Sequence, residues 1–192
     1  MRLFKSAMKK YFLLFAVALM ALATACEKKD ISIQEGEDYI VIKGIKWALK
    51  PVTSYLGDVE EAVPPGFSSP TLDQLKKLPQ VSAMYYGHLS DGTKGVLFGN
   101  TFIGDYSYSS VGDDGTVKNA DYNRYTFTDD DLKHGVFLPV NDGWDGYYWG
   151  KYDQGYYTYL HFSMIEMKTY MVPNMDAGRV LTILGGLLPV KN

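Results

Sequence analysis

The chain has 192 residues, with 19 basic and 22 acidic side chains, a formal net charge of −3, and a hydrophobic fraction of 46%. An acidic surface repels phosphate backbones, so this balance disfavours nucleic-acid binding. A single cysteine excludes an intramolecular disulfide framework, and the length suits one domain with its own hydrophobic core.

The N-terminal residues have the pattern of an export signal. Four basic residues lie within the first ten positions, and an apolar run over residues 11–25 follows them. This run is shorter than the roughly 20 residues that a membrane-spanning helix needs, and it ends in small residues, as secretory signals do. We therefore predict a signal peptide over residues 1–25, whose removal leaves 15 basic and 22 acidic residues, a net charge of −7.

The end of this signal fits two kinds of processing. Ala23-Thr24-Ala25 satisfies an ordinary small-x-small cleavage rule. Followed by Cys26, the same residues resemble a bacterial lipobox, in which the cysteine is lipidated, although Ala23 stands where a larger aliphatic residue is usual. We favour lipidation of Cys26, because an exported protein seldom keeps one idle thiol at its cleavage point. Acyl chains would then hold the protein in a membrane.

The polar segment 26–38 is predicted to be a flexible tether, with a single domain over residues 39–192. An alternative is that Ile31 and Ile33 already begin the first strand.

Two short helices are expected. Thr71 can cap a helix and Gln74 completes a capping box, while Pro79 ends the segment. The leucines of one helix face are Leu72, Leu75 and Leu78. A second helix is predicted to begin in the segment 128–133, whose aspartates favour the helix dipole.

Strand composition and turn residues dominate the rest of the chain. Strands are predicted in 39–43, 81–89, 94–103, 122–128, 135–140, 157–164, 178–184 and 186–190, with a hairpin turn at 90–93. The segment 157–164 alternates, so that Thr158, Leu160, Phe162 and Met164 face one way and Tyr157, Tyr159, His161 and Ser163 the other. The predicted fold class is α+β, with mostly antiparallel strands, few short helices and long loops.

Five segments carry a resemblance to a known family. They are "IKWALKPV" (45–52), "PPGFSSPTLDQLKKL" (64–78), "SDGTKGVLFGN" (90–100), "GVFLPVNDGWDGYYWGKYDQGYYTYLHF" (135–162) and "GLLPV" (186–190). In this order they resemble the Fibrobacter succinogenes major paralogous domain, a family common in lipoproteins of Bacteroidetes. The family is similar to the formylglycine-generating-enzyme and C-type-lectin-like folds, so the resemblance implies an irregular domain with long loops over a small twisted sheet.

The chain departs from this family at several positions. Gly150 and Lys151 replace the two serines that follow the family's tyrosine–tryptophan pair, and the arginines near Pro70 and Pro189 are absent. The oxidase relatives of the fold depend on cysteine and metal, whereas Cys26 is assigned here to the anchor. The resemblance therefore implies a divergent, non-catalytic member.

Aromatic residues crowd the segment 146–162, where they fill eight of seventeen positions. Tyr148, Trp149, Tyr159 and Phe162 are expected to pack within the fold. Large rings with little conformational entropy also suit sugar rings and peptide side chains. The candidate ligand-binding residues, chosen because they lie between glycines and aspartates, are Trp144, Tyr147, Tyr152 and Tyr156.

Catalytic and metal motifs are weak. His88, His134 and His161 lie 46 and 27 residues apart, so no pair has zinc-ligand spacing. Two carboxylates for glycan hydrolysis could come from any loops, and the sequence does not indicate which. Calcium needs six to eight oxygens, and its weak candidates Asn141, Asp142 and Asp145, like Asp113 and Asp114, are more typical of turns. We expect neither a metal nor a cofactor.

These observations predict a lipid-anchored protein in the outer membrane of a Gram-negative bacterium, exported and without enzymatic activity. Adhesion, or the capture of a glycan or protein at the cell surface, is the expected function. A structural or accessory subunit of a surface assembly is the alternative, and a glycan hydrolase is a third.

Overall fold

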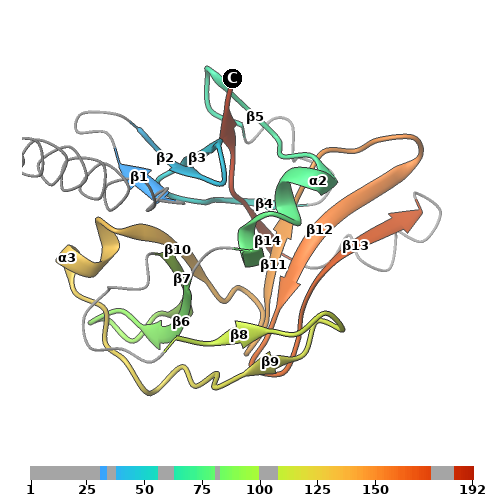
Figure 1. The fold of residues 1–192 in the computed structure, drawn as a ribbon. Coiled ribbons are helices and arrows are strands. Elements are labelled where there is room, and N and C mark those ends of the chain that lie inside the picture. The colour runs from blue at the N-terminus through green and yellow to red at the C-terminus, as the bar shows by residue number, and fades with distance from the viewer. Residues whose placement is uncertain (1–30, 34–37, 56–62, 81–82, 100–107, 174–183) are drawn as a thin grey trace, which may run out of the picture.

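The computed structural model describes residues 31–33, 38–55, 63–80, 83–99, 108–173 and 184–192. The described chain is a β-rich fold with mostly antiparallel strands and few short helices, which confirms the coarse fold prediction (Figure 1). The predicted signal peptide and Cys26 lie outside the described residues, as do parts of the predicted strands near residues 81, 101 and 180.

The first sheet has five strands in the order β1-β2-β3-β15-β5. Their bounds are β1 Ile31–Ile33, β2 Tyr39–Ile42, β3 Ile45–Ala48, β15 Val190–Lys191 and β5 Phe67–Ser68. β1 pairs with β2 over its full length. The alternative reading of residues 31–33 is therefore the one observed, and these three residues of the predicted tether belong to a sheet instead.

The second sheet contains the predicted hairpin. β6 (Ala83–His88) and β7 (Lys94–Gly99) are antiparallel, and β10 (Gly135–Pro139) pairs with the other side of β7. At the connecting turn, the Asp91 carboxylate accepts the backbone N–H of Thr93 at 2.8 Å. The turn residues therefore close the hairpin as the sequence predicts.

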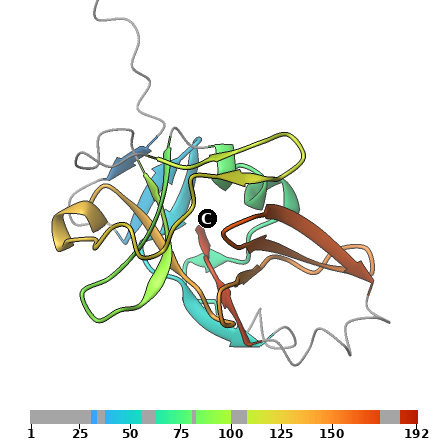
Figure 2. The same cartoon turned by 90° about the horizontal axis from the view of Figure 1, so that it is seen from below.

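The third sheet has the order β13-β12-β11-β14-β4, and only the β11–β14 pair is parallel. Its strands are β4 Val52–Tyr55, β11 Gly146–Trp149, β12 Tyr156–Phe162, β13 Met167–Pro173 and β14 Leu184–Leu187. A small ribbon of β8 (Ser110–Val111) and β9 (Val117–Lys118) lies beside the start of β13 (Figures 1 and 2).

Both predicted helices form, and each lasts one turn. α2 (Leu72–Leu75) has the predicted capping box between Thr71 and Gln74, and a 3-10 helix over Leu78–Gln80 follows it. α3 (Asp129–Leu132) begins at Thr128, whose capping partner is Asp131. Two reciprocal hydrogen bonds thus satisfy backbone groups that a helix start leaves open.

All three sheets contribute to one main core. Trp47, Phe98 and Phe162 are fully buried in it, one from each sheet. The buried phenols have acceptors, since Tyr86 donates to the carbonyl of Ser163 and Tyr148 to that of Pro139, both at 2.7 Å. The core is therefore aromatic without unsatisfied phenols at these two positions.

The predicted strand over 122–128 is wrong. Tyr122 is fully buried in the main core, and Thr126 forms only an isolated bridge with His88. Because the Asp121 carboxylate accepts the N–H of Asn123, the backbone turns where a strand would have to extend.

In the part of the chain that the structure describes, no helix is long and apolar enough to cross a membrane.

Candidate functional site

Strand alternation gathers aromatic side chains on the outer face of the third sheet. Residues directly opposite in antiparallel strands share a face, and Tyr147 is opposite His161 while Tyr159 is opposite Tyr170. We call this surface the tyrosine face, and it consists of the half-buried side chains Tyr147, Tyr157, Tyr159, His161 and Tyr170. The opposite side of β12 carries Thr158, Leu160 and Phe162, which are buried. The predicted alternation is therefore confirmed over residues 157–162, whereas Ser163 and Met164 lie beyond the end of the strand and Ser163 is buried.

The rings of the tyrosine face contact one another. Tyr147 stacks on His161 with ring centroids 4.9 Å apart, and Tyr159 stacks on Tyr170 at 5.2 Å. Tyr147 and Tyr159 join these pairs at 6.1 Å. Such ring contacts restrict the rotamers of each ring, so the arrangement of the surface is fixed by the fold.

Trp149 borders this surface on the same face of the sheet, since it is directly opposite Tyr159 in the β11–β12 pair. It is completely buried and meets Tyr159 edge-on at 5.1 Å. Leu187 of β14 is also completely buried beside it, with Val52 and Val63 packed around the pair. One side of the tyrosine face therefore packs against a buried apolar cluster.

Charged groups lie at one end of the tyrosine face, where β12 ends and β13 begins. The imidazole of His161 lies between two carboxylates, with Nε2 3.2 Å from Asp145 Oδ1 and Nδ1 3.4 Å from Glu166 Oε1. Glu166 also accepts hydrogen bonds from Lys168 Nζ at 2.7 Å and from the phenol of Tyr170. An imidazole with protons on both nitrogens can donate to both carboxylates at once.

These contacts lower the pKa of the Glu166 carboxyl group and raise the pKa of the neighbouring phenols. Hydrogen bonds from Lys168 and Tyr170 lower the pKa of Glu166 to about 2, and its carboxylate raises the pKa of Tyr170 to about 12. Partial burial, together with nearby carboxylates, also raises the pKa of Tyr147 and of Tyr159. At neutral pH the site thus combines fixed carboxylate acceptors with phenol donors.

The four predicted ligand-binding residues do not lie together. Tyr147 belongs to the tyrosine face, and Tyr152 touches its far end through Tyr157, with ring centroids 4.7 Å apart. Tyr156 is 39% exposed, but it lies on the same side of β12 as the buried residues Thr158, Leu160 and Phe162, and not on the tyrosine face. The β11–β12 hairpin separates Tyr152 and Tyr156, at its turn, from Trp144, which precedes β11 (Figure 1).

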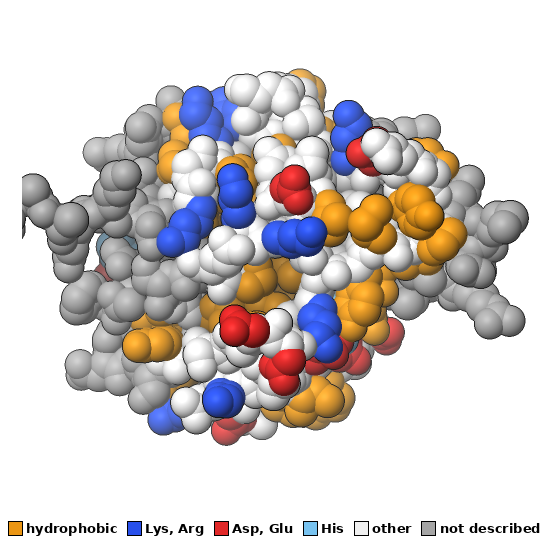
Figure 3. Space-filling view, turned by 45° about the vertical axis from the view of Figure 1, so that its right-hand side comes forward, with side chains coloured by type: hydrophobic (Ala, Val, Ile, Leu, Met, Phe, Trp, Pro, Cys, Tyr) orange, Lys and Arg blue, Asp and Glu red, His pale blue; other side chains and the backbone are white. Residues whose placement is uncertain are grey.

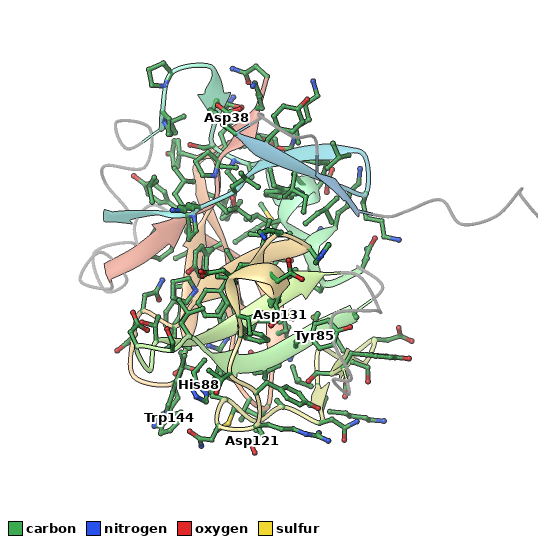
Figure 4. The ribbon with its side chains drawn as sticks, turned by 90° about the vertical axis from the view of Figure 1, so that its left-hand side faces the viewer. Asp38, Tyr85, His88, Asp121, Asp131 and Trp144 are labelled. Carbon is green, nitrogen blue, oxygen red and sulfur yellow. The ribbon has the colours of Figure 1, made fainter. Side chains whose placement is uncertain are left out.

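Trp144 lies in a different environment. Its ring stacks on Tyr122 at 6.2 Å, Lys94 Nζ lies 3.5 Å from the ring centroid, and 49% of the residue is exposed. Figure 4 shows it near His88, at the end of the molecule away from Asp38. The cation–π contact occupies one side of the indole, so Trp144 is partly engaged within the fold.

The weak calcium candidates serve the turn before β11. The side-chain amide of Asn141 bonds to the N–H and C=O of Tyr147, both at 2.9 Å. Asp142 and Asp145 form a backbone bridge, and the Asp145 carboxylate faces His161. Among the described residues, no group of three or more histidine, cysteine, aspartate or glutamate side chains is arranged to hold a metal ion.

Other parts of the surface are mixed in character. A polar groove of about 470 Å³ lies between Lys76, the turn at Asp113 and Asp114, and the start of β13. Figure 3 shows that on one side of the molecule hydrophobic side chains alternate with lysines and acidic residues. On this side no charge of one sign dominates, so charge alone does not select a partner there.

Sequence reasoning missed His161, Glu166 and Tyr170 as members of one site. The alternation in the sequence of β12 did indicate that His161 and Tyr159 lie on the same side of the strand. The register of β13, which brings Tyr170 and Lys168 opposite these residues, has no local sequence signal.

Comparison with protein-family models, with curated proteins and with solved structures found no match for this chain.

Proposed function

We propose that this chain is an exported, lipid-anchored binding protein of the Gram-negative cell envelope, in which the tyrosine face holds a neutral glycan without catalysis. The observation that carries the proposal is the continuous set of half-exposed rings on three strands, with carboxylates at one end. Anchoring at Cys26 in the outer membrane, and divergent membership of the Fibrobacter succinogenes major paralogous domain family with its lectin-like fold, belong to the same proposal. They rest on the sequence segments quoted above.

The chemistry of the tyrosine face suits a sugar. Pyranose rings have an apolar face of C–H groups that packs on aromatic rings, and hydroxyl groups around the edge. The phenols of Tyr147 and Tyr159 supply hydrogen-bond donors, and Asp145 supplies an acceptor whose side chain is 38% exposed. A neutral sugar fits better than an acidic one, because Asp145 and Glu166 would repel a negative charge.

A glycan array tests this proposal. We expect purified protein to give a signal on neutral glycans that Tyr159→Ala and Tyr147→Ala each weaken at least tenfold. The matched control is Tyr108→Ala, which removes a half-exposed tyrosine outside the tyrosine face and should leave the signal unchanged. Circular dichroism and thermal melting establish that each variant is folded. Equal signals from all four proteins, or a signal lost equally with Tyr108→Ala, would contradict the proposed site.

A role as an accessory subunit of a surface assembly is the second candidate. Ile165, just before the edge strand β13, is 76% exposed, and Met171, within that strand, is 51% exposed. Exposed apolar side chains on an edge strand are a typical contact site for a protein partner. Stoichiometric co-purification of one envelope protein, lost on Ile165→Asp and Met171→Asp, would favour this role over glycan binding.

A glycan hydrolase is the third and weakest candidate. Hydrolysis needs a carboxylic acid that is protonated near the working pH. The low pKa of Glu166 works against that role, and its acceptor oxygens are already occupied by Lys168 and Tyr170. Turnover abolished by Asp145→Asn would be the result that favours the enzyme.

A further inference from the structure

A second, apolar cavity lies on the other side of the molecule from the tyrosine face. It measures about 560 Å³ and opens between the β3–β4 connection, α3 and β10. Figure 4 shows this side, on which Asp131 marks α3 and Tyr85 marks β6. Cavities of about 300–1,000 Å³ with mainly apolar walls are typical of small-molecule sites.

The wall of the cavity is built from side chains that the fold only partly buries. Leu89, Leu132 and Phe137 pack on the small core cluster outside the second sheet and present their other sides to the cavity. Leu49, which is 36% exposed, lies across from them in the β3–β4 connection. A ligand that filled this space would remove all four side chains from water, and that burial favours binding.

Two lysines and one aspartate line the cavity. Lys50 and Lys133 both line it, and Lys50 has no ion pair among the residues that the structure describes. Lys133 pairs with Asp130 at 3.2 Å, but both side chains are mostly exposed, so that pair is weak. Asp129 is the acidic residue of this lining, whereas Asp131, which caps α3, is not part of it.

From this combination we infer that the cavity is a binding site for a long-chain carboxylate, with the alkyl chain between Leu49 and Phe137 and the carboxylate at Lys50. The alkyl chain matches the apolar wall, and an anionic head group matches Lys50, the lysine of this lining that has no ion pair among the described residues. This site is independent of the tyrosine face and of the proposed glycan binding.

Displacement of a fluorescent polyene fatty acid tests the inference. The full chain carrying Cys26→Ala is titrated with cis-parinarate and then with saturated carboxylates from hexanoate to tetradecanoate, all kept below micelle formation. Affinity should rise about fourfold for each added methylene, as burial of one CH₂ requires, and level off when the cavity is full. Dodecanol should bind more weakly than dodecanoate by up to about fivefold, the upper end of the range for an exposed ion pair.

Variants separate this site from non-specific adsorption. Lys50→Gln should remove the preference for dodecanoate over dodecanol, whereas the control Lys118→Gln, on β9 and outside the cavity, should not. Leu132→Trp should shorten the chain length at which affinity levels off; if it does not fold, Leu49→Trp at the exposed rim replaces it.

Several results would overturn the inference. They are absence of displacement, equal affinity for dodecanoate and dodecyltrimethylammonium, and affinity that keeps rising with chain length in all variants. A concentration-dependent dimer that Leu132→Trp abolishes would also overturn it, because the cavity would then receive a second copy of the chain.

Discussion

Glu166 lies at the point where three neighbouring side chains favour a negative charge. Lys168 and Tyr170 donate to its two oxygens, and His161 lies within 3.4 Å of one of them. The carboxylate is 28% exposed, so solvent screens these contacts only in part. Its lowered pKa means that the folded protein prefers the ionised form more strongly than the unfolded chain does.

Replacing this carboxylate should change how stability depends on pH. The pKa falls from 4.5 in the unfolded chain to about 2 in the folded protein. The stabilisation is therefore fully present above pH 4.5 and is lost as the pH falls towards 2. Glu166→Gln should lower the free energy of unfolding by about 1–2 kcal/mol at pH 7, after allowance for screening, and by much less at pH 2.5. Urea unfolding at both pH values measures the difference.

The control for this experiment is Asp130→Asn. Asp130 also pairs with a lysine, but both side chains are more than two-thirds exposed. Its replacement should change stability by less than about 0.5 kcal/mol at either pH. A Glu166→Gln effect that is the same at pH 7 and pH 2.5 would show that the carboxylate charge is not what stabilises the site.

Single residues of the site were predictable only where the signal was local. The sequence indicated an aromatic surface near residues 144–156, and Tyr147 does belong to the tyrosine face. Trp144 does not belong to the tyrosine face, because its indole stacks on Tyr122. Tyr122 was predicted to lie in a strand, but it is buried in the core. That contact depends on the tertiary fold, which no window of sequence around Trp144 contains.

At the scale of elements, the glycines of β14 explain how β11 fits into its sheet. Tyr148 and Trp149 are adjacent, so they point to opposite faces of the sheet. Each lies over a glycine of the parallel neighbour: a Cβ at Gly186 would be 2.4 Å from Tyr148 Cε1, and one at Gly185 2.0 Å from Trp149 Nε1. Two consecutive glycines thus leave room for two consecutive large rings.

A methyl group at Gly185 should therefore be costly. Gly185→Ala should lower the free energy of unfolding by about 2–3 kcal/mol, because the indole is buried and cannot move aside freely. In a Trp149→Leu background the same substitution should cost at least about 1 kcal/mol less, since the ring that it meets is absent. Denaturant unfolding of the four proteins in this cycle measures the coupling. Equal costs in both backgrounds would mean that contact with Trp149 is not the cause.

Elements with complete local signals were predicted well. Both one-turn helices have capping boxes within four residues, and the β6–β7 hairpin has its turn residues between two apolar runs. The order of strands was not predictable, because β14 inserts between β4 and β11 from a distant part of the chain. Pairing at such separations depends on the whole core rather than on local composition.

At the scale of the whole molecule, two short connections join the first and third sheets. The chain passes from β3 to β4 through residues 49–51 and from β14 to β15 through residues 188–189. These passages lie beside each other, since the N–H of Ala48 donates to the carbonyl of Pro189 at 2.8 Å. Leu188 is fully buried at this crossing, so the two sheets share one core and should unfold together.

This arrangement also sets the direction in which an anchored molecule would face. β1, the first described strand, lies on the side of the molecule opposite β13 in both ribbon views (Figures 1 and 2). A lipid at Cys26, a few residues before β1 in the sequence, would therefore place β13 on the side away from the membrane. We expect native protein from membranes to carry acyl mass at Cys26 and Cys26→Ala to appear in the soluble exported fraction, because acyl burial supplies the attachment. Intact-mass spectrometry and phase partitioning measure both. A free thiol at Cys26, or a Cys26→Ala protein that stays with the membrane, would remove the anchor and with it the argument for this orientation.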